Sequence, residues 1–262
     1  MPFKKIRIKT RIIPFTLTLM TLLATSQSYA IESDDSWKFE VAPYIWAMNM
    51  NGRVQTGNKT AHIAQTFSDI LSQLNWAGMV YLDAHKDKLG LYFNAMYAVL
   101  SQTDKTGPIN VNLTTKYGVF GAGVSYQVYK KILANQVSQV NVEPYVGLRY
   151  TIDNTTLKIA RFSFTNNQNW TDPVIGAKVN YIINKQWLAF VAGDVGGTNF
   201  NNHNSYSANA FIGYKPQSFL TNTTVYAGYR LLYQYYITGS GTSRFGWDMK
   251  LFGPVVGLGI NF

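Results

Sequence analysis

The chain has 262 residues, 15% of them aromatic and only 14% charged, a composition unlike that of disordered proteins. It has no cysteine, which excludes disulfide bonds, thiolate metal sites and a lipidated cysteine anchor. The formal net charge of +10 falls to +5 for residues 31–262, where 18 basic and 13 acidic residues remain. Lys130-Lys131 is the one basic cluster left there, so we expect no nucleic-acid partner.

Residues 1–30 have the pattern of a cleavable signal peptide. Basic residues from Lys4 to Arg11 precede an apolar run of 13 residues, Ile12 to Ala24, and Ser28 and Ala30 supply small side chains at a cleavage point. The run is shorter than the roughly 20 residues that a membrane-spanning helix needs. We therefore expect an exported protein, with a signal peptide at 1–30 and one domain at 31–262.

After Ala30, segments of alternating apolar and polar residues recur along almost the whole chain. This period of two predicts β-strands. Ten are expected, at 37–48, 76–85, 89–101, 113–129, 139–151, 170–183, 187–197, 205–215, 220–236 and 246–262.

In most of these segments one face is apolar and the other carries the charges. In 139–151, for example, Val146 and Leu148 share one face while Glu143 and Arg149 share the other. The links alternate between short turns, such as 86–88 and 184–186, and longer loops of up to 27 residues, at 49–75. These features are typical of a transmembrane antiparallel barrel, which satisfies its backbone hydrogen bonds without water. We expect an all-β barrel of about ten strands in a Gram-negative outer membrane, with a secreted β-sandwich as the alternative.

The strand number has an alternative. Segments 60–67 and 155–164 could be additional strands, which would give twelve and would separate Arg149 from Asp172.

In the first long loop, Ser68 to Leu74 is expected to form a short helix, with Ser68 as N-cap and Ile70, Leu71 and Leu74 at helical spacing. We expect it to pack on the barrel rim or in the mouth, a gate or lid being the alternative; with twelve strands it would lie on the periplasmic side.

The face opposite the lipid would place ionisable and aromatic side chains inside the barrel. The expected interior charges are Glu40, Asp83, His85, Glu143, Arg149, Asp172, Lys178, Asp194, Arg230 and Asp248. The aromatic side chains expected to narrow the lumen are Tyr44, Trp46, Tyr81, Tyr92, Tyr145 and Tyr226.

A single register would pair two sets of opposite interior charges. Facing residues of antiparallel neighbours have a constant sum of residue numbers, and this sum is 321 both for Arg149 with Asp172 and for Glu143 with Lys178. We predict both contacts. They would form either a structural ladder of ion pairs that fills the lumen or a charged constriction that selects solutes.

The sequence offers little for catalysis. Its three histidines are His85, on the same face as Asp83, and His62 and His203 in expected loops, the last near Ser205. No nucleophile is evident beside His85, and scattered histidines do not make a metal site. We expect no catalytic residues, no metal and no cofactor.

The chain ends in "VVGLGINF", which resembles the assembly signal of bacterial outer-membrane barrels. The resemblance implies that Phe262, Ile260, Leu258 and Val256 are recognised by the barrel-assembly machinery. The blocks "WKFEVAPYIWAMNMNG", "SDILSQL", "DPVIGAKVNY", "LAFVAGDVGG" and "VYAGYRLLYQYY" also resemble a widespread, functionally uncharacterised family of proteobacterial outer-membrane barrels. This similarity runs from Trp37 to Phe262 and implies a fold but no activity.

Three functions are compatible with such a barrel. The first is a porin-like protein, embedded in outer-membrane lipid, with a structural role or passage for small solutes only, because ten strands enclose a narrow lumen. The second is surface adhesion, in which loops rich in Asn and Thr contact an extracellular ligand. The third is a lipid-modifying enzyme.

Overall fold

The computed structural model describes residues 36–262 except 107–108, 135–136, 160–161 and 218–221. The predicted signal peptide lies outside these residues. The first elements along the chain are β1 (Lys38–Trp46), β2 (Asn49–Thr56), β3 (Lys59–Gln65), α1 (Phe67–Gln73), β4 (Leu74–Lys86), β5 (Leu89–Thr106), β6 (Ile109–Tyr126) and β7 (Tyr129–Ile132). They are followed by β8 (Gln139–Ile159), β9 (Phe162–Ile182), β10 (Trp187–Asn199), β11 (His203–Tyr214), β12 (Thr223–Thr238), the 3₁₀ turn η1 (Gly241–Ser243) and β13 (Phe245–Asn261).

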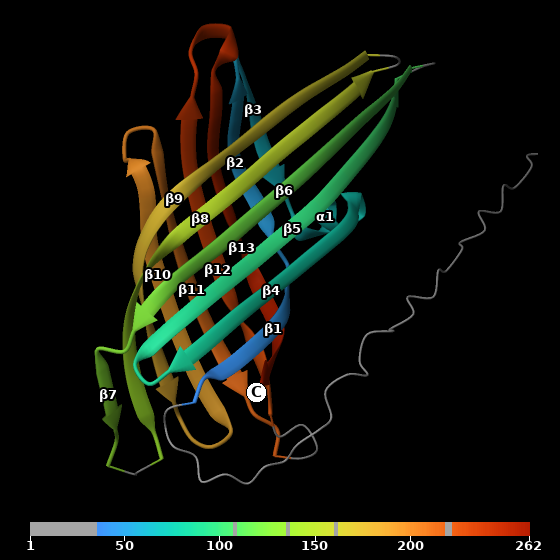
Figure 1. Ribbon diagram of the computed structural model, residues 1–262. Helices are drawn as coiled ribbons and strands as arrows, with labels where there is room; N and C mark the ends of the chain where they lie inside the picture. Colours follow the sequence, from blue (N-terminus) through green and yellow to red (C-terminus); the bar gives the residue numbers. More distant parts are fainter. Residues whose placement is uncertain (1–35, 107–108, 135–136, 160–161, 218–221) are drawn as a thin grey trace, which may run out of the picture. The chain divides into compact units, whose positions relative to one another are not determined.

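Ten strands form a closed antiparallel barrel (Figure 1). Their order is β1-β4-β5-β6-β8-β9-β10-β11-β12-β13, and β13 pairs with β1 to close the ring. The hairpin β2–β3 continues the sheet along β13, which pairs with β1 near its C-terminal end and with β2 near its start. The predicted all-β ten-stranded barrel is confirmed.

The twelve-strand alternative is wrong because neither segment adds a strand to the barrel ring. Residues 155–159 are the end of β8 and 162–164 the start of β9, and the two run on as one hairpin. Segment 60–65 belongs to β3, which pairs with β2 at the edge of the sheet.

The two ends of the barrel differ. At the short-turn end, β4 and β5 are joined at 87–88 and β9 and β10 at 183–186. At the long-loop end lie the β2–β3 hairpin, α1 and the β8–β9 hairpin. Figure 1 shows the β5–β6 and β8–β9 hairpins running well past α1.

Nearer the short-turn end, the barrel is apolar outside and polar inside. The outward side chains of Val146, Ile175 and Val256 are 51%, 61% and 57% exposed, whereas Glu143 and Arg149 are buried. An outward apolar band of this kind is the surface that a barrel presents to lipid. None of the helices in the described ranges has the length and apolar character to cross a bilayer.

Toward the long-loop end this polarity reverses, as β13 shows. Its alternation runs without a register shift, so that Trp247 and Met249 are buried in the interior while Lys250 points outward. The expectation that Asp248 lies inside is therefore wrong: it faces outward and forms an ion pair of 2.6 Å with Arg53. An outward charge is stable here because this part of the strand lies beyond the apolar band.

An apolar core fills the barrel at the long-loop end. It includes Trp46, Met48, Met50, Ile70, Met96, Leu100, Tyr117, Val119, Trp170, Leu232, Phe245, Trp247, Met249, Leu251 and Val255. Side chains from strands that are not neighbours meet in it. The ring of Tyr117 on β6 stacks on that of Trp247 on β13 at 5.5 Å, and that of Trp170 on β9 stacks on that of Tyr236 on β12 at 4.7 Å. These contacts cross the lumen.

Helix α1 begins earlier than expected. Its N-cap is Thr66, not Ser68, because Thr66 and Asp69 form a capping box in which each side chain accepts a hydrogen bond from the other residue's backbone N–H. The hydrogen bonds from Thr66 lower the pKa of the Asp69 carboxyl. Ile70 is buried in the apolar core, so the helix packs at the rim of the long-loop end.

Candidate functional site

Between the apolar core and the short-turn end lies a cavity of about 200 Å³. It is lined by five of the six aromatic residues expected in the lumen, Tyr44, Tyr81, Tyr92, Tyr145 and Tyr226, while the sixth, Trp46, belongs to the core. Gly147 provides room for one of them, since a Cβ there would lie 2.4 Å from the Tyr92 hydroxyl. The cavity also contains buried charges.

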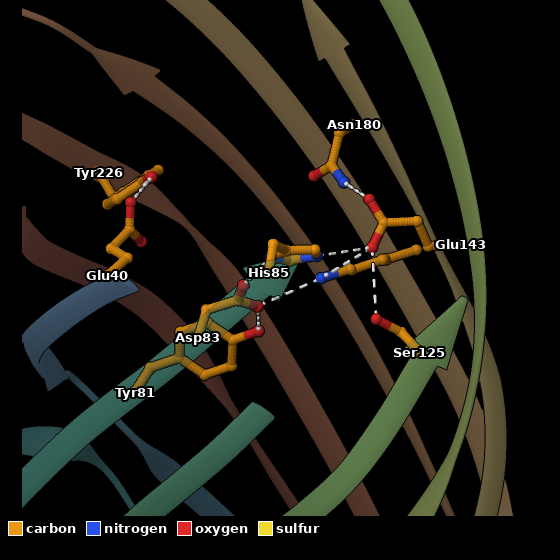
Figure 2. A network of polar contacts seen from close by, with 9 residues as sticks. Glu40, Tyr81, Asp83, His85, Ser125, Glu143, Asn180 and Tyr226 are labelled. Carbon is orange, nitrogen blue, oxygen red and sulfur yellow. Dashed lines mark hydrogen bonds and ion pairs between the residues drawn. The ribbon is translucent and has the colours of Figure 1, made fainter. Parts of the chain in front are cut away.

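Figure 2 shows a polar network near the short-turn end, centred on the Glu143 carboxylate. His85 Nε2 lies 3.1 Å from Glu143 Oε2, and Asn180 donates to Oε1 at 3.1 Å. Lys178 Nζ lies 3.1 Å from Glu143 and 3.2 Å from Asp83, which also forms an ion pair with His85 Nδ1. These side chains come from β4, β8 and β9, so the network ties opposite walls of the barrel together.

Both of the predicted pairs face each other in the β8–β9 register, Glu143 opposite Lys178 and Arg149 opposite Asp172. The Glu143–Lys178 contact forms. In the described residues, however, Arg149 makes no ion pair with Asp172, and that predicted contact is wrong.

Arg149 reaches across β9 to β10 instead. It donates to Asp194 Oδ1 at 2.6 Å and to Ser205 Oγ at 2.9 Å. Gly176 stands on β9 beside Asp194 and permits this approach, because a Cβ there would lie 2.7 Å from the Cβ of Asp194. Tyr145 and Ser207 donate to the other carboxylate oxygen of Asp194 at 2.9 and 2.6 Å, so this pair is fully engaged.

Arg230 and Glu40 are the remaining expected interior charges, and both line the cavity. Arg230 donates to the Tyr44 hydroxyl at 3.0 Å and to Asn94 Oδ1 at 3.3 Å. Glu40 accepts a hydrogen bond of 2.9 Å from the Tyr226 hydroxyl. Each is therefore held by neutral partners.

The buried Asp172 forms an ion pair with His203 Nε2, and His203 Nδ1 lies 2.8 Å from the Thr198 hydroxyl. The contact between Asp172 and His203 is ionic only, since neither Asp172 oxygen nor His203 Nε2 has a hydrogen-bond partner in the described residues. The Thr198–His203 contact braces the β10–β11 turn, because the two residues are five apart across it. The sequence suggested Ser205 as a neighbour of His203, but Ser205 accepts from Arg149 instead.

The described residues offer no metal centre, since no three His, Cys, Asp or Glu side chains in those ranges are grouped to hold an ion. His62 lies apart from the other two histidines, on the β2–β3 hairpin beside Arg53.

The predicted assembly signal is the end of β13. Its outward residues Val256, Leu258 and Phe262 are 57%, 40% and 68% exposed, and Phe262 exchanges two backbone hydrogen bonds with Phe39 on β1. Recognition of these residues by the assembly machinery stays a prediction.

The closed antiparallel sheet, its outward apolar band and its buried charges define the chain as an outer-membrane β-barrel protein. The outer-membrane protease OmpT of Escherichia coli is structurally similar, with a TM-score of 0.53 and 8% identity over 89% of this chain and 99% of OmpT. At this identity the likeness concerns the fold alone. Weaker matches include Ail of Yersinia pestis (TM-score 0.32, 11% identity, 87% of this chain and 99% of Ail) and the neisserial surface protein NspA (0.28, 11%, 88% and 98%). No protein-family model and no curated protein matches the chain.

Proposed function

We propose that this outer-membrane barrel passes no solutes and acts through the β-structure that it holds outside the bilayer at its long-loop end, as a surface-contact protein. Among the functions considered from the sequence, the proposal favours surface adhesion over passive transport and assigns no catalytic role.

The observation that carries the proposal is the apolar core across the lumen. The side chains of Trp46, Leu232, Met249 and Leu251 are at most 2% exposed, and rings from opposite walls stack there. A small-solute pore needs a continuous wet path, whereas fully buried side chains are packed across the lumen here. The polar networks nearer the short-turn end are then structural ties between strands.

The strand lengths support a role outside the membrane. β8 and β9 have 21 residues each, about twice the roughly 9–11 that a barrel strand needs to cross a bilayer. Beyond the apolar band their outward residues include Asn154, Thr156 and Lys158. The long-loop end thus presents hydrogen-bonded strands rather than unstructured loops, polar on the outward face and with Phe164 exposed on the other face. Such strands are suited to contact with another molecule.

Electrical recording tests the absence of a pore. The folded protein, without residues 1–30, is expected to give no discrete current steps in a planar lipid bilayer, because the apolar core blocks ions. Met249→Gly is the variant for comparison. It removes a core side chain that is 0% exposed and so partly opens the lumen. Regular ion-conducting steps from the unmodified protein would contradict the proposal.

Labelling of intact cells tests which end faces outward, and the natural absence of cysteine makes it simple. Cysteine at Thr60, exposed on β3, is expected to react with a membrane-impermeant maleimide. Cysteine at Lys185, exposed in the β9–β10 turn, is the matched control and is expected to react only after the cells are opened. The reverse pattern would place the β2–β3 hairpin in the periplasm and refute the proposed role.

A further inference from the structure

In the described part of the chain, three Lys and Arg side chains line the cavity, and one of them lacks a counter-charge. Lys178 lies 3.1 Å from Glu143, and Arg149 lies 2.6 Å from Asp194. Arg230 has no carboxylate partner in the described ranges. Its guanidinium is therefore the unneutralised cation of the cavity.

The surroundings of Arg230 hold it in place without neutralising it. Both of its terminal nitrogens lie 3.3 Å from Asn94 Oδ1, and one also donates to the Tyr44 hydroxyl at 3.0 Å. Its Cζ lies 4.9 Å from the centre of the Trp46 ring, in cation–π contact. Its Nε is buried with no hydrogen-bond partner. A buried cation in a neutral shell is costly, and a bound carboxylate would supply both the charge and the missing acceptor.

The wall beside Arg230 is aromatic. Phe190 and Phe211 line the cavity and stack at 4.8 Å, and Tyr226 meets Phe190 edge to face at 6.3 Å. Phe211 is on β11 and Arg230 on the adjacent β12, so the rings and the guanidinium face the same space. Such a wall favours a flat apolar ligand by stacking.

The size and polarity of the cavity restrict what fits. Its volume of about 200 Å³ is below the roughly 300–1,000 Å³ of pockets for drug-sized ligands, so a molecule with a single ring is the appropriate scale. Glu40 binds Tyr226, which precedes Arg230 by four residues on β12, or about 13 Å along the strand. An anion is therefore favoured at the Arg230 end, away from Glu40.

We propose that this cavity binds a small aromatic carboxylate, with the carboxylate on Arg230 and the ring against Phe190 and Phe211. The apolar core closes the long-loop side, so the ligand reaches the cavity from the short-turn end. This site is independent of the proposed surface contact, which concerns the opposite end of the barrel.

Three probes separate the contributions of charge and ring. Benzoate has both, acetate has only the carboxylate, and benzyl alcohol has only the ring. In calorimetric titrations of the folded barrel in detergent micelles, benzoate is expected to bind at least about tenfold more tightly than either of the others, since a charged hydrogen bond and ring burial each contribute on that scale. Tryptophan fluorescence is a second readout, because the ring of Trp46, one of the six tryptophans, touches Arg230.

Two variants test the location. Arg230→Gln keeps a hydrogen-bond donor near Tyr44 and Asn94 but removes the charge, and it is expected to weaken benzoate binding at least about tenfold. Ala192→Phe leaves Arg230 intact and fills the cavity, which Ala192 lines, so it is expected to abolish binding even if Arg230→Gln does not fold. Lys250→Gln, on the outward face of β13, is the matched control and is expected to leave binding unchanged.

Circular dichroism establishes that each variant is a folded barrel. Equal affinities for benzoate and benzyl alcohol, or for benzoate and acetate, would overturn the proposal. So would unchanged benzoate binding in folded Ala192→Phe, or no benzoate binding to the unmodified protein up to about 10 mM, which would fill even a millimolar site.

Discussion

Replacing Arg149 with alanine is expected to lower the free energy of unfolding by about 3–5 kcal/mol, the cost of breaking a buried ion pair from one side. The side chains of Arg149 and Asp194 are 9% and 6% exposed, so the carboxylate left behind has little access to water. Tyr145 and Ser207 would still donate to Asp194, which places the expected loss at the lower end of that range. Urea unfolding from lipid vesicles, followed by tryptophan fluorescence, measures it.

A second Arg–Asp pair in the same protein is the matched control. Arg53 and Asp248 also lie 2.6 Å apart, but the Arg53 side chain is 58% exposed and its charge is solvated with or without the partner. Arg53→Ala is therefore expected to have a much smaller effect. The double variant Arg149→Ala/Asp194→Ala is expected to lose less free energy of unfolding than the two single variants lose together, since it leaves no charge unpaired. If Arg149→Ala and Arg53→Ala lowered the free energy of unfolding equally, burial of the ion pair would not determine its contribution to stability.

The alternation of side chains predicted the barrel, the pattern of short turns and long loops favoured ten strands over twelve, and the pairing of opposite charges predicted the β8–β9 register. Period-two faces depend only on the local backbone, and residue numbers of antiparallel neighbours add to a constant, so Glu143 opposite Lys178 and Arg149 opposite Asp172 followed from the sequence. The partner of Arg149 did not follow. That choice depends on Gly176 leaving space toward Asp194 on the next strand, a property of three strands together.

The sequence also left the apolar core unpredicted, because the same alternation has opposite meanings inside and outside the bilayer. Along β13 the outward face changes from Leu258 and Val256 to Lys250 and Asp248, while the inward face changes from glycine to Met249 and Trp247. In lipid the outside of a barrel must be apolar, whereas in water the inside must be, as in any soluble sheet. The point of inversion near Phe252 is a signal that could have located the core.

Val256→Arg is expected to reduce the free energy of folding into lipid vesicles by about 2–4 kcal/mol, the cost of a basic side chain on the lipid face near the bilayer midplane. Val256 is 57% exposed, faces outward and lies near the middle of the outward apolar part of β13. Urea titrations of vesicle-folded protein measure the loss. Thr60→Arg is the control. Thr60 is exposed on β3, which among the described strands pairs with β2 alone, beyond the apolar band, so the stability of the Thr60→Arg protein is expected to equal that of the unmodified protein. If Val256→Arg were as harmless as Thr60→Arg, the exposed apolar side chains could not be facing hydrocarbon, because a charge has no such depth dependence on a surface that already faces water.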